Sequence, residues 1–161
     1  LIIPAKIPVH KELEGDASAG DRLAMLRLAL SAHDRFDVLG LEMDREKPSY
    51  TIFTVEELAE RYPGAELFLI MGADSFNEFD TWREYRRIAE MATIVVMRRP
   101  GEYPLRGDLL EKLPRVLKAD NPLMDISSSS IRKLVREGKG AGDMLPAPVM
   151  QYIKDKRLYL K

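Results

Sequence analysis

The sequence predicts an α/β protein: a Rossmann-like parallel sheet, doubly wound, with helices on both faces. Three observations support this prediction. Apolar segments of strand length alternate along the chain with segments of helical periodicity. The strand-like segments carry apolar residues at successive positions, as strands buried on both faces require. Charged and hydroxyl side chains follow these segments, at the carboxyl ends where open parallel sheets bind their ligands.

The N-terminal part of the chain predicts two strands with a helix between them. Residues 1–4 form an apolar run closed by a proline, which is typical of a buried strand that ends in a loop. Apolar residues recur on one face of residues 22–32, so we expect an amphipathic helix with Asp21 as its cap. Residues 36–39 alternate like a short strand.

A second helix and a central strand are expected next. Residues 54–57 fit a capping box, so the helix should begin there, and Pro63 should end it. Residues 66–71 are expected to form a central strand, which runs into Gly72 and Asp74. Such a pair can place a carboxylate on a ribose hydroxyl. A tight turn into a helix would use the same residues, so the pattern leaves both interpretations open.

The middle of the chain carries the only tryptophan, Trp82, just before a predicted helix over residues 83–91. A single tryptophan in a globular domain is usually a core residue. Residues 93–97 are β-branched and predict a strand. That strand ends in Arg98 and Arg99, which is unusually basic for a purely structural turn.

The C-terminal part predicts a short helix around residues 109–113, a weak strand at 116–117 and a terminal helix over 147–156. Between them lies a run of four consecutive serines followed by apolar residues at helical spacing. Serines are poor inside helices but good caps. We therefore expect a helix that begins near Ser128 and stops at Gly138.

This serine-capped helix start is a candidate anion site. It combines free backbone N–H groups and the positive end of the helix dipole with Arg132 and Lys133, and such a start suits a polyphosphate. A surface helix can also begin with serines for capping alone. The nucleotide interpretation gains support from three other loops at expected strand ends, residues 6–11, 72–82 and 98–101, which carry groups for phosphate, ribose and ring stacking.

Composition excludes several classes of protein. With 161 residues, 45% of them hydrophobic, the chain suits one domain with its own core. Its 25 basic and 26 acidic residues nearly cancel, which argues against nucleic acid or an anionic membrane as a partner. There is no cysteine for a disulfide or a thiolate metal site, and we expect a cytoplasmic protein. No apolar run approaches the roughly 18 residues of a membrane span.

Six segments, in order along the chain, resemble the bacterial nicotinate-nucleotide adenylyltransferases of the nucleotidyltransferase superfamily. Residues 126–132 look like the superfamily signature I-S-S-T-x-I-R, with Ser129 at the threonine position. The other similar segments are residues 8–11, 49–51, 71–82, 99–101 and 145–159. One such motif would be weak, but six in register over essentially the whole chain are specific.

Members of this family join nicotinate mononucleotide to the AMP part of ATP, giving deamido-NAD and pyrophosphate. The resemblance therefore implies an enzyme of NAD biosynthesis whose partners are ATP and nicotinate mononucleotide, with Mg²⁺ arriving on ATP. Because one phosphate attacks another, no protein nucleophile is needed, and alignment with charge neutralisation must lower the barrier. A monomer and a homo-oligomer are both compatible with this activity.

The resemblance implies six residues on the ATP side and three on the mononucleotide side. Those expected at the ATP phosphates are Ser127, Ser129 and Arg132. Those expected to line the adenosine side are Gly72, Asp74 and Arg99. On the mononucleotide side, the expected roles are stacking on the nicotinate ring, contact near its carboxylate and contact near the phosphate, by Trp82, Thr51 and Lys11 respectively.

One element of the family has no match here. Its G-x-F-D-P-x-H-x-G-H segment supplies two histidines that stabilise the transferring phosphate, whereas His10 and His33 lie 23 residues apart and lack the glycine between them. We expect residues 1–161 to be a single nucleotidyltransferase domain whose first strand and turn lie upstream of Leu1. The 161 residues then hold no catalytic residue or metal ligand of their own and should be inactive alone.

Two other interpretations stay open. The protein could be another adenylyltransferase of the superfamily, acting on pantetheine phosphate or nicotinamide mononucleotide, although Trp82 and residues 49–51 favour nicotinate mononucleotide. It could also be a nucleotide-binding module without catalysis. Codons for an H-x-G-H motif upstream of Leu1 would favour the enzyme.

Overall fold

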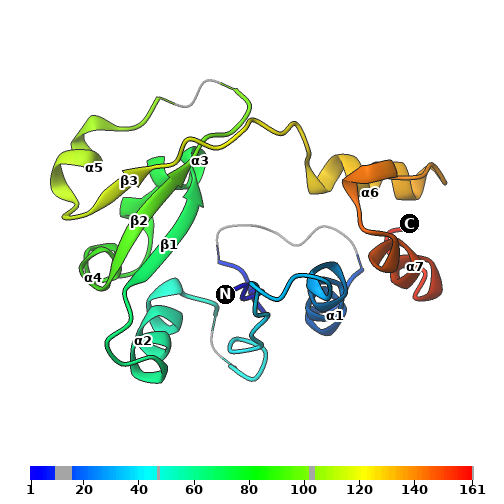
Figure 1. Ribbon diagram of the computed structural model, residues 1–161, viewed down its shortest axis with the longest axis horizontal. Helices are drawn as coiled ribbons and strands as arrows, with labels where there is room; N and C mark the ends of the chain where they lie inside the picture. The colour runs from blue at the N-terminus through cyan, green and yellow to red at the C-terminus, as the bar shows by residue number, and fades with distance from the viewer. Residues whose placement is uncertain (10–15, 47, 102–103, 161) are drawn as a thin grey trace. The chain divides into compact units, whose positions relative to one another are not determined.

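A computed structural model describes residues 1–9, 16–46, 48–101 and 104–160 (Figure 1). The chain forms two compact units. The first unit consists of Leu1–Ser49 and Ile126–Lys161, and the second unit consists of Tyr50–Asp125. Each unit has a hydrophobic cluster of its own.

The second unit is built on a parallel sheet. Its strands are β1 (Leu67–Gly72), β2 (Ala92–Met97) and β3 (Val116–Lys118), which lie side by side in the order β1-β2-β3 (Figure 1). Leu67 pairs with Ala92, and Ile94 pairs with Val116. The α/β class and the parallel sheet are therefore confirmed, together with the three strands predicted in this part of the chain.

The two faces of this sheet differ in burial. On one face Met71, Ile94 and Val96 are buried, and they belong to a cluster that includes the fully buried rings of Phe76 and Phe79. The opposite face is apolar but open. Its exposed side chains are those of Phe68 (52% exposed), Ile70 (64%) and Leu117 (53%).

The expectation of a central strand at residues 66–71 is wrong for the sheet that the described residues form. In that sheet β1 lies at an edge and β2 lies between the other two strands. An apolar residue at every position indicates that a strand can be buried on both faces, but it does not say which strand has a neighbour on each side.

Helices and short helical turns precede and connect the strands of the second unit. They are α2 (Thr51–Arg61), α3 (Ala73–Asn77), η1 (Phe79–Thr81), α4 (Tyr85–Met91) and α5 (Gly107–Lys112). The predicted start of α2 at residues 54–57 is wrong by one turn. Ile52 and Val55 both enter the core, so the helix has to begin before Ile52, and Thr54 is a buried residue inside it.

The helices of the first unit are α1 (Ala19–Leu30), α6 (Ser128–Arg136), η2 (Gly142–Met144) and α7 (Ala147–Asp155). The strands predicted at residues 1–4 and 36–39 meet in a single parallel bridge between Ile2 and Val38. Two backbone hydrogen bonds form it, from the Ile2 N–H to Asp37 and from the Leu39 N–H to Ile2. In the described residues no helix has the length and apolarity needed to cross a membrane.

The cap of α1 is Ser18 and not Asp21, which corrects the prediction. Asp21 stands three residues later and completes a capping box, because each of the two side chains bonds to the backbone N–H of the other residue. The Asp21 carboxylate also accepts a hydrogen bond of 2.8 Å from the Tyr152 hydroxyl on α7. The bonds from Ser18 and Tyr152 lower the pKa of Asp21, so this carboxylate stays ionised and links α1 to α7.

Candidate nucleotide-binding site

Three residues predicted for the adenosine side meet at the carboxyl end of the sheet in the second unit. Gly72 is the last residue of β1, and it pairs with Met97, the last residue of β2. Arg99 follows Met97 by two residues, so it lies just beyond the end of β2. Arg99 Nη1 donates to Asp74 Oδ2 over 2.7 Å. We call Gly72, Asp74 and Arg99 the strand-end cluster.

The absence of a side chain at Gly72 is what allows the Asp74 and Arg99 side chains to lie where they do. A Cβ atom built on Gly72 would lie 2.5 Å from Asp74 Oδ1 and 2.7 Å from Arg99 Cδ. Both distances are shorter than van der Waals contact. Any other residue at position 72 would therefore displace the aspartate, the arginine or both.

The strand-end cluster keeps one acceptor without a partner. Asp74 Oδ1 is buried and has no hydrogen-bond partner, which is unfavourable for a carboxylate oxygen. Beside the cluster lies a pocket of about 260 Å³ at the carboxyl ends of β2 and β3, and its lining includes Arg98, Arg99 and Lys118. A hydroxyl donor at Asp74 and an anion at the three cations would both be stabilised here.

The tip of α6 lies in the first unit and confirms the predicted helix start. Ser127 is the N-cap, and its hydroxyl accepts from the Ser130 N–H over 3.1 Å. Arg132 Nη2 donates to Ser129 Oγ over 3.0 Å, so two of the predicted phosphate residues contact each other. The helix ends as predicted, because Gly138 adopts a φ of 69°, which favours glycine.

A pocket of about 400 Å³ adjoins this tip within the first unit. Its lining includes Ser128 and Arg132 from α6, Arg22 from α1, and apolar residues of α1 and α7. Arg22 Nη1 donates to the Ala5 carbonyl over 2.6 Å, which attaches α1 to the segment that follows residues 1–4. Two guanidinium groups thus border a largely apolar space beside the start of α6.

The residues predicted for the mononucleotide side lie in the second unit, apart from Lys11, which lies outside the described residues. Thr51 is the first residue of α2, and no side chain caps that helix at Tyr50. Trp82 follows η1, is partly buried, and its ring meets the Phe79 ring edge to face at 5.4 Å. Trp82 is therefore packed against the core without being enclosed by it.

Arg83 connects these two segments, a contact that no sequence pattern indicated. Its guanidinium lies 5.0 Å from the centre of the Tyr50 ring and 5.3 Å from that of Phe53. Such cation–π contacts hold the residues around Trp82 beside the start of α2. The one sequence signal for this contact is an arginine next to the tryptophan, because the two aromatic rings belong to a segment about 30 residues earlier.

Among the described residues there is no group of three or more histidine, aspartate or glutamate side chains that could hold a metal ion. A divalent ion carried by a nucleotide's phosphates fits these residues better than a cage of protein ligands, because the strand-end cluster and the α6 tip present cations and hydroxyls.

Comparisons with known proteins identify the family of this chain. The cytidylyltransferase-like family model matches residues 1–134. A probable nicotinate-nucleotide adenylyltransferase of Citrifermentans bemidjiense is 40% identical, over 99% of this chain and 83% of that protein. One from Desulfitobacterium hafniense is 39% identical, over 99% of this chain and 80% of that protein.

A solved structure has the same fold. It is the nicotinic acid mononucleotide adenylyltransferase of Plasmodium falciparum complexed with NaAD, with a TM-score of 0.75 and 17% sequence identity. The match covers 98% of this chain and 80% of that one. Since the sequence relatives match nearly the whole chain and the family model matches most of it, the protein belongs to the cytidylyltransferase-like family, among the nicotinate-nucleotide adenylyltransferases.

Proposed function

We infer that the protein transfers the adenylyl group of ATP to nicotinate mononucleotide, giving deamido-NAD and pyrophosphate in NAD biosynthesis. The observation that carries this inference is the 40% identity to a probable nicotinate-nucleotide adenylyltransferase over 99% of the chain. The strand-end cluster and the α6 tip agree with it, because both present groups suited to a nucleotide. We expect the enzyme to work in the cytoplasm.

The strand-end cluster is proposed to bind the adenosine side of ATP. Asp74 Oδ1, now without a hydrogen-bond partner, would accept from a ribose hydroxyl. Arg99 would keep its bond to Asp74 Oδ2 and present its remaining N–H groups to the nucleotide. Gly72 would leave the space that both side chains need.

The α6 tip is proposed to bind the ATP phosphates. Ser129 and Arg132 already contact each other and would donate together to phosphate oxygens. Ser127 holds the helix start in place, because its hydroxyl accepts from the Ser130 N–H. The N–H groups of the first turn and the helix dipole would add to the attraction for an anion.

The mononucleotide side is proposed to consist of Trp82, Thr51 and Lys11. Trp82 would stack on the nicotinate ring while its edge-to-face contact with Phe79 holds it against the core. Thr51 begins a helix without a side-chain cap, so its hydroxyl and the N–H groups beside it suit the nicotinate carboxylate. Lys11 would neutralise the phosphate of the mononucleotide.

In the proposed reaction a phosphate oxygen of the mononucleotide attacks the α-phosphorus of ATP, and the bond to pyrophosphate breaks. The chain's residues contribute alignment and charge neutralisation, since they hold both nucleotides and supply cations such as Arg132. When bound to the ATP phosphates, Mg²⁺ would supply further charge neutralisation for the leaving pyrophosphate.

Turnover of the complete gene product with alternative acceptors tests this proposal. Pyrophosphate release is measured with ATP and, in turn, nicotinate mononucleotide, nicotinamide mononucleotide and pantetheine phosphate. We expect nicotinate mononucleotide to have the largest kcat/KM. A larger value for either other acceptor would refute the substrate assignment, and binding of both nucleotides with no turnover would identify a non-catalytic module.

A further inference from the structure

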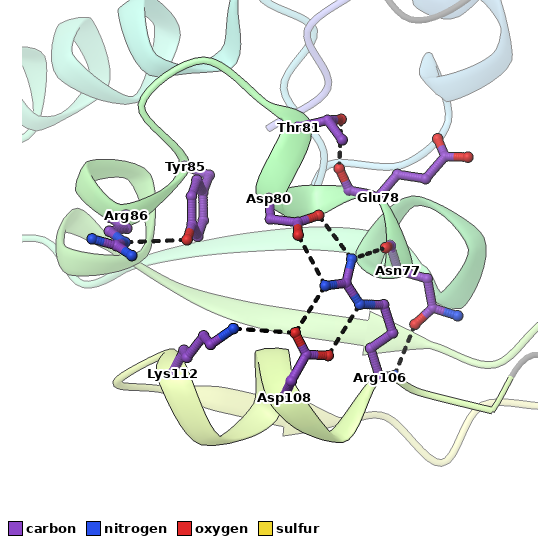
Figure 2. A network of polar contacts seen from close by, with 9 residues as sticks. All are labelled: Asn77, Glu78, Asp80, Thr81, Tyr85, Arg86, Arg106, Asp108 and Lys112. Carbon is purple, nitrogen blue, oxygen red and sulfur yellow. Dashed lines mark hydrogen bonds and ion pairs between the residues drawn. The ribbon is translucent and has the colours of Figure 1, made fainter.

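A cluster of ionic contacts in the second unit, separate from the residues assigned above, centres on Arg106. Its guanidinium lies between two carboxylates, with Asp80 of η1 on one side and Asp108 of α5 on the other (Figure 2). Arg106 is the N-cap of α5, and Asp80 lies in the turn that leads to Trp82. The cluster therefore links α5 to the segment that carries the tryptophan.

On the side of η1, Arg106 makes contacts with both ends of a short segment. Nη1 donates to the Asn77 carbonyl over 3.0 Å and to Asp80 Oδ1 over 2.9 Å, and Nη2 lies 2.9 Å from Asp80 Oδ2. The Asn77 side chain completes the connection, because it accepts from the Arg106 N–H and donates to the Pro104 carbonyl, each over 3.0 Å. Residues 77–80 are thereby held at several points.

On the side of α5, Asp108 fixes the orientation of the guanidinium. Arg106 Nε donates to Asp108 Oδ1 over 3.1 Å and Nη2 donates to Oδ2 over 2.8 Å, while Lys112 Nζ lies 3.2 Å from the same Oδ2. The hydrogen bonds from Arg106, and then that from Lys112, lower the pKa of Asp108 to about 2. The carboxylate is therefore ionised throughout the neutral range.

The contacts of η1 transmit this anchoring to Trp82. The Trp82 N–H donates to the Phe79 carbonyl over 3.0 Å, and the Phe79 side chain is fully buried. Phe79 thus attaches the turn to the core, and Arg106 attaches it to α5 through Asp80. Without the Arg106 side chain, the Asp80 carboxylate and the Asn77 carbonyl would each lose a charged donor. The turn would keep its attachment at the buried Phe79 and the hydrogen bonds of the Asn77 side chain, but the direct link from Asp80 to α5 would be lost.

Arginine suits this position better than lysine. A planar guanidinium can donate at the same time to two carboxylates and a carbonyl, whereas an ammonium group is a compact charge without a fixed fork. The Arg106 side chain is 39% exposed, so solvent weakens the purely electrostatic part of these contacts. Its effect should therefore lie in geometry more than in overall stability.

We propose that Arg106 is a positioning residue for mononucleotide binding, which holds the turn at residues 77–81 so that the Trp82 ring is presented to the nicotinate ring. The proposal rests on the proposed function for the identity of the ligand. Arg106 lies 24 positions beyond Trp82, and the proposal is that it affects the binding of nicotinate mononucleotide but not that of ATP.

The tryptophan itself is the probe, because the chain contains no other. We expect Arg106→Ala to shift the Trp82 emission to longer wavelength and to increase its quenching by acrylamide, without any ligand present. In titrations followed by the same emission, the Kd for nicotinate mononucleotide should rise about tenfold, since a small misplacement of a binding group is costly. The Kd for ATP, measured by calorimetry, should change by less than about twofold.

Three variants control this experiment. Lys112→Ala removes one positive charge from the same helix. The Lys112 ammonium group bonds to Asp108 and not to Asp80 or Asn77 among the described residues, so this variant should leave the emission and both Kd values unchanged. Arg106→Lys should recover part of the mononucleotide affinity. Asp80→Asn keeps the shape of the side chain and should reproduce the Arg106→Ala effect in weaker form, which keeps the test decisive if Arg106→Ala fails to fold.

The outcomes separate this proposal from the proposed function. If wild-type protein binds nicotinate mononucleotide and both Arg106→Ala and Asp80→Asn bind it equally well, the positioning role is refuted and the function stands. Equal losses for ATP and mononucleotide would indicate general destabilisation and would also refute it. If wild-type protein does not bind nicotinate mononucleotide, the proposed function is refuted, and the role of Arg106 toward that ligand is refuted with it.

Discussion

The α6 tip and the strand-end cluster are both proposed to bind ATP, but they are assembled differently. At the tip each contact joins residues three positions apart, Ser127 with Ser130 and Ser129 with Arg132. In the strand-end cluster, the ion pair joins residues 25 positions apart. One is a property of a single helix, and the other depends on the register of two strands.

This difference indicates how many neighbouring side chains a substitution in each region should disturb. Removal of the Ser129 or Arg132 side chain would take away the contacts of that residue and leave the cap at Ser127 in place. A side chain added at Gly72 would disturb Asp74 and Arg99 together, because both lie against it. The following predictions test this contrast, from the largest expected effect on ligand binding to the smallest.

Removal of the tip cation should have the largest effect. We expect Arg132→Ala to weaken ATP binding by about 1.5–3 kcal/mol, the range for a charge-assisted hydrogen bond to an anion. Calorimetric titration with ATP measures it. Arg136→Ala is the control, because Arg136 is the last residue of α6 and lies at the other end of the helix. An ATP affinity unchanged by Arg132→Ala would remove Arg132 from the site.

A methyl group at position 72 should break the strand-end cluster. Gly72→Ala should weaken ATP binding by about 1–3 kcal/mol, because displacement of the Asp74 carboxylate would leave the proposed ribose hydroxyl without its acceptor. The matched control is Gly140→Ala, since a Cβ on Gly140 meets no atom within 4 Å. If both alanine variants bind ATP like wild-type protein, the two strand ends do not form a binding site.

Loss of the tryptophan ring should act on one substrate only. Trp82→Ala should weaken nicotinate mononucleotide by about 0.5–1.5 kcal/mol through lost ring stacking and leave ATP nearly unchanged. Tyr62→Ala removes a more exposed aromatic ring at the end of α2 and serves as the control. Calorimetry with each nucleotide separates the two constants, and equal losses in both would contradict the assignment of Trp82.

The cap of α6 should affect stability more than binding. Ser127→Ala should lower the free energy of unfolding by about 1 kcal/mol, because the Ser130 N–H loses its acceptor. Ser129→Ala should have the opposite pattern: the free energy of unfolding should change little, and the affinity for ATP should fall, since Ser129 contacts Arg132. Urea denaturation and ATP titration of both variants measure these effects. Identical behaviour of the two variants would contradict separate roles for Ser127 in capping and Ser129 in phosphate binding.

The fold was predictable where local periodicity was strong. The strands β1 and β2 and the helix α6 lie within a residue or two of their predicted bounds, because apolar runs of strand length and a serine cap act over neighbouring residues. The starts of α1 and α2 were misjudged. In α2 a buried pair at Ile52 and Val55 outweighed a capping pattern, and core contacts cannot be read from a capping motif.

The candidate site divides along the same line. Sequence patterns indicated the residues of the strand-end cluster one by one, but not that Asp74 and Arg99 form an ion pair over Gly72. They gave no indication of Arg106 or of its contacts with Asp80 and Asp108. A charged residue in a loop is too common for its presence to predict a partner 26 positions away.

By itself, the sequence determined the α/β class, the order of the main helices and strands, and the hydroxyl-rich start of α6, because those features follow from side-chain periodicity and capping patterns among neighbouring residues. Only the tertiary structure decided that Asp74 meets Arg99 and that Arg106 anchors the turn before Trp82. Those contacts exist because strand register and core packing bring together residues 25 or more positions apart, and no local pattern encodes that distance.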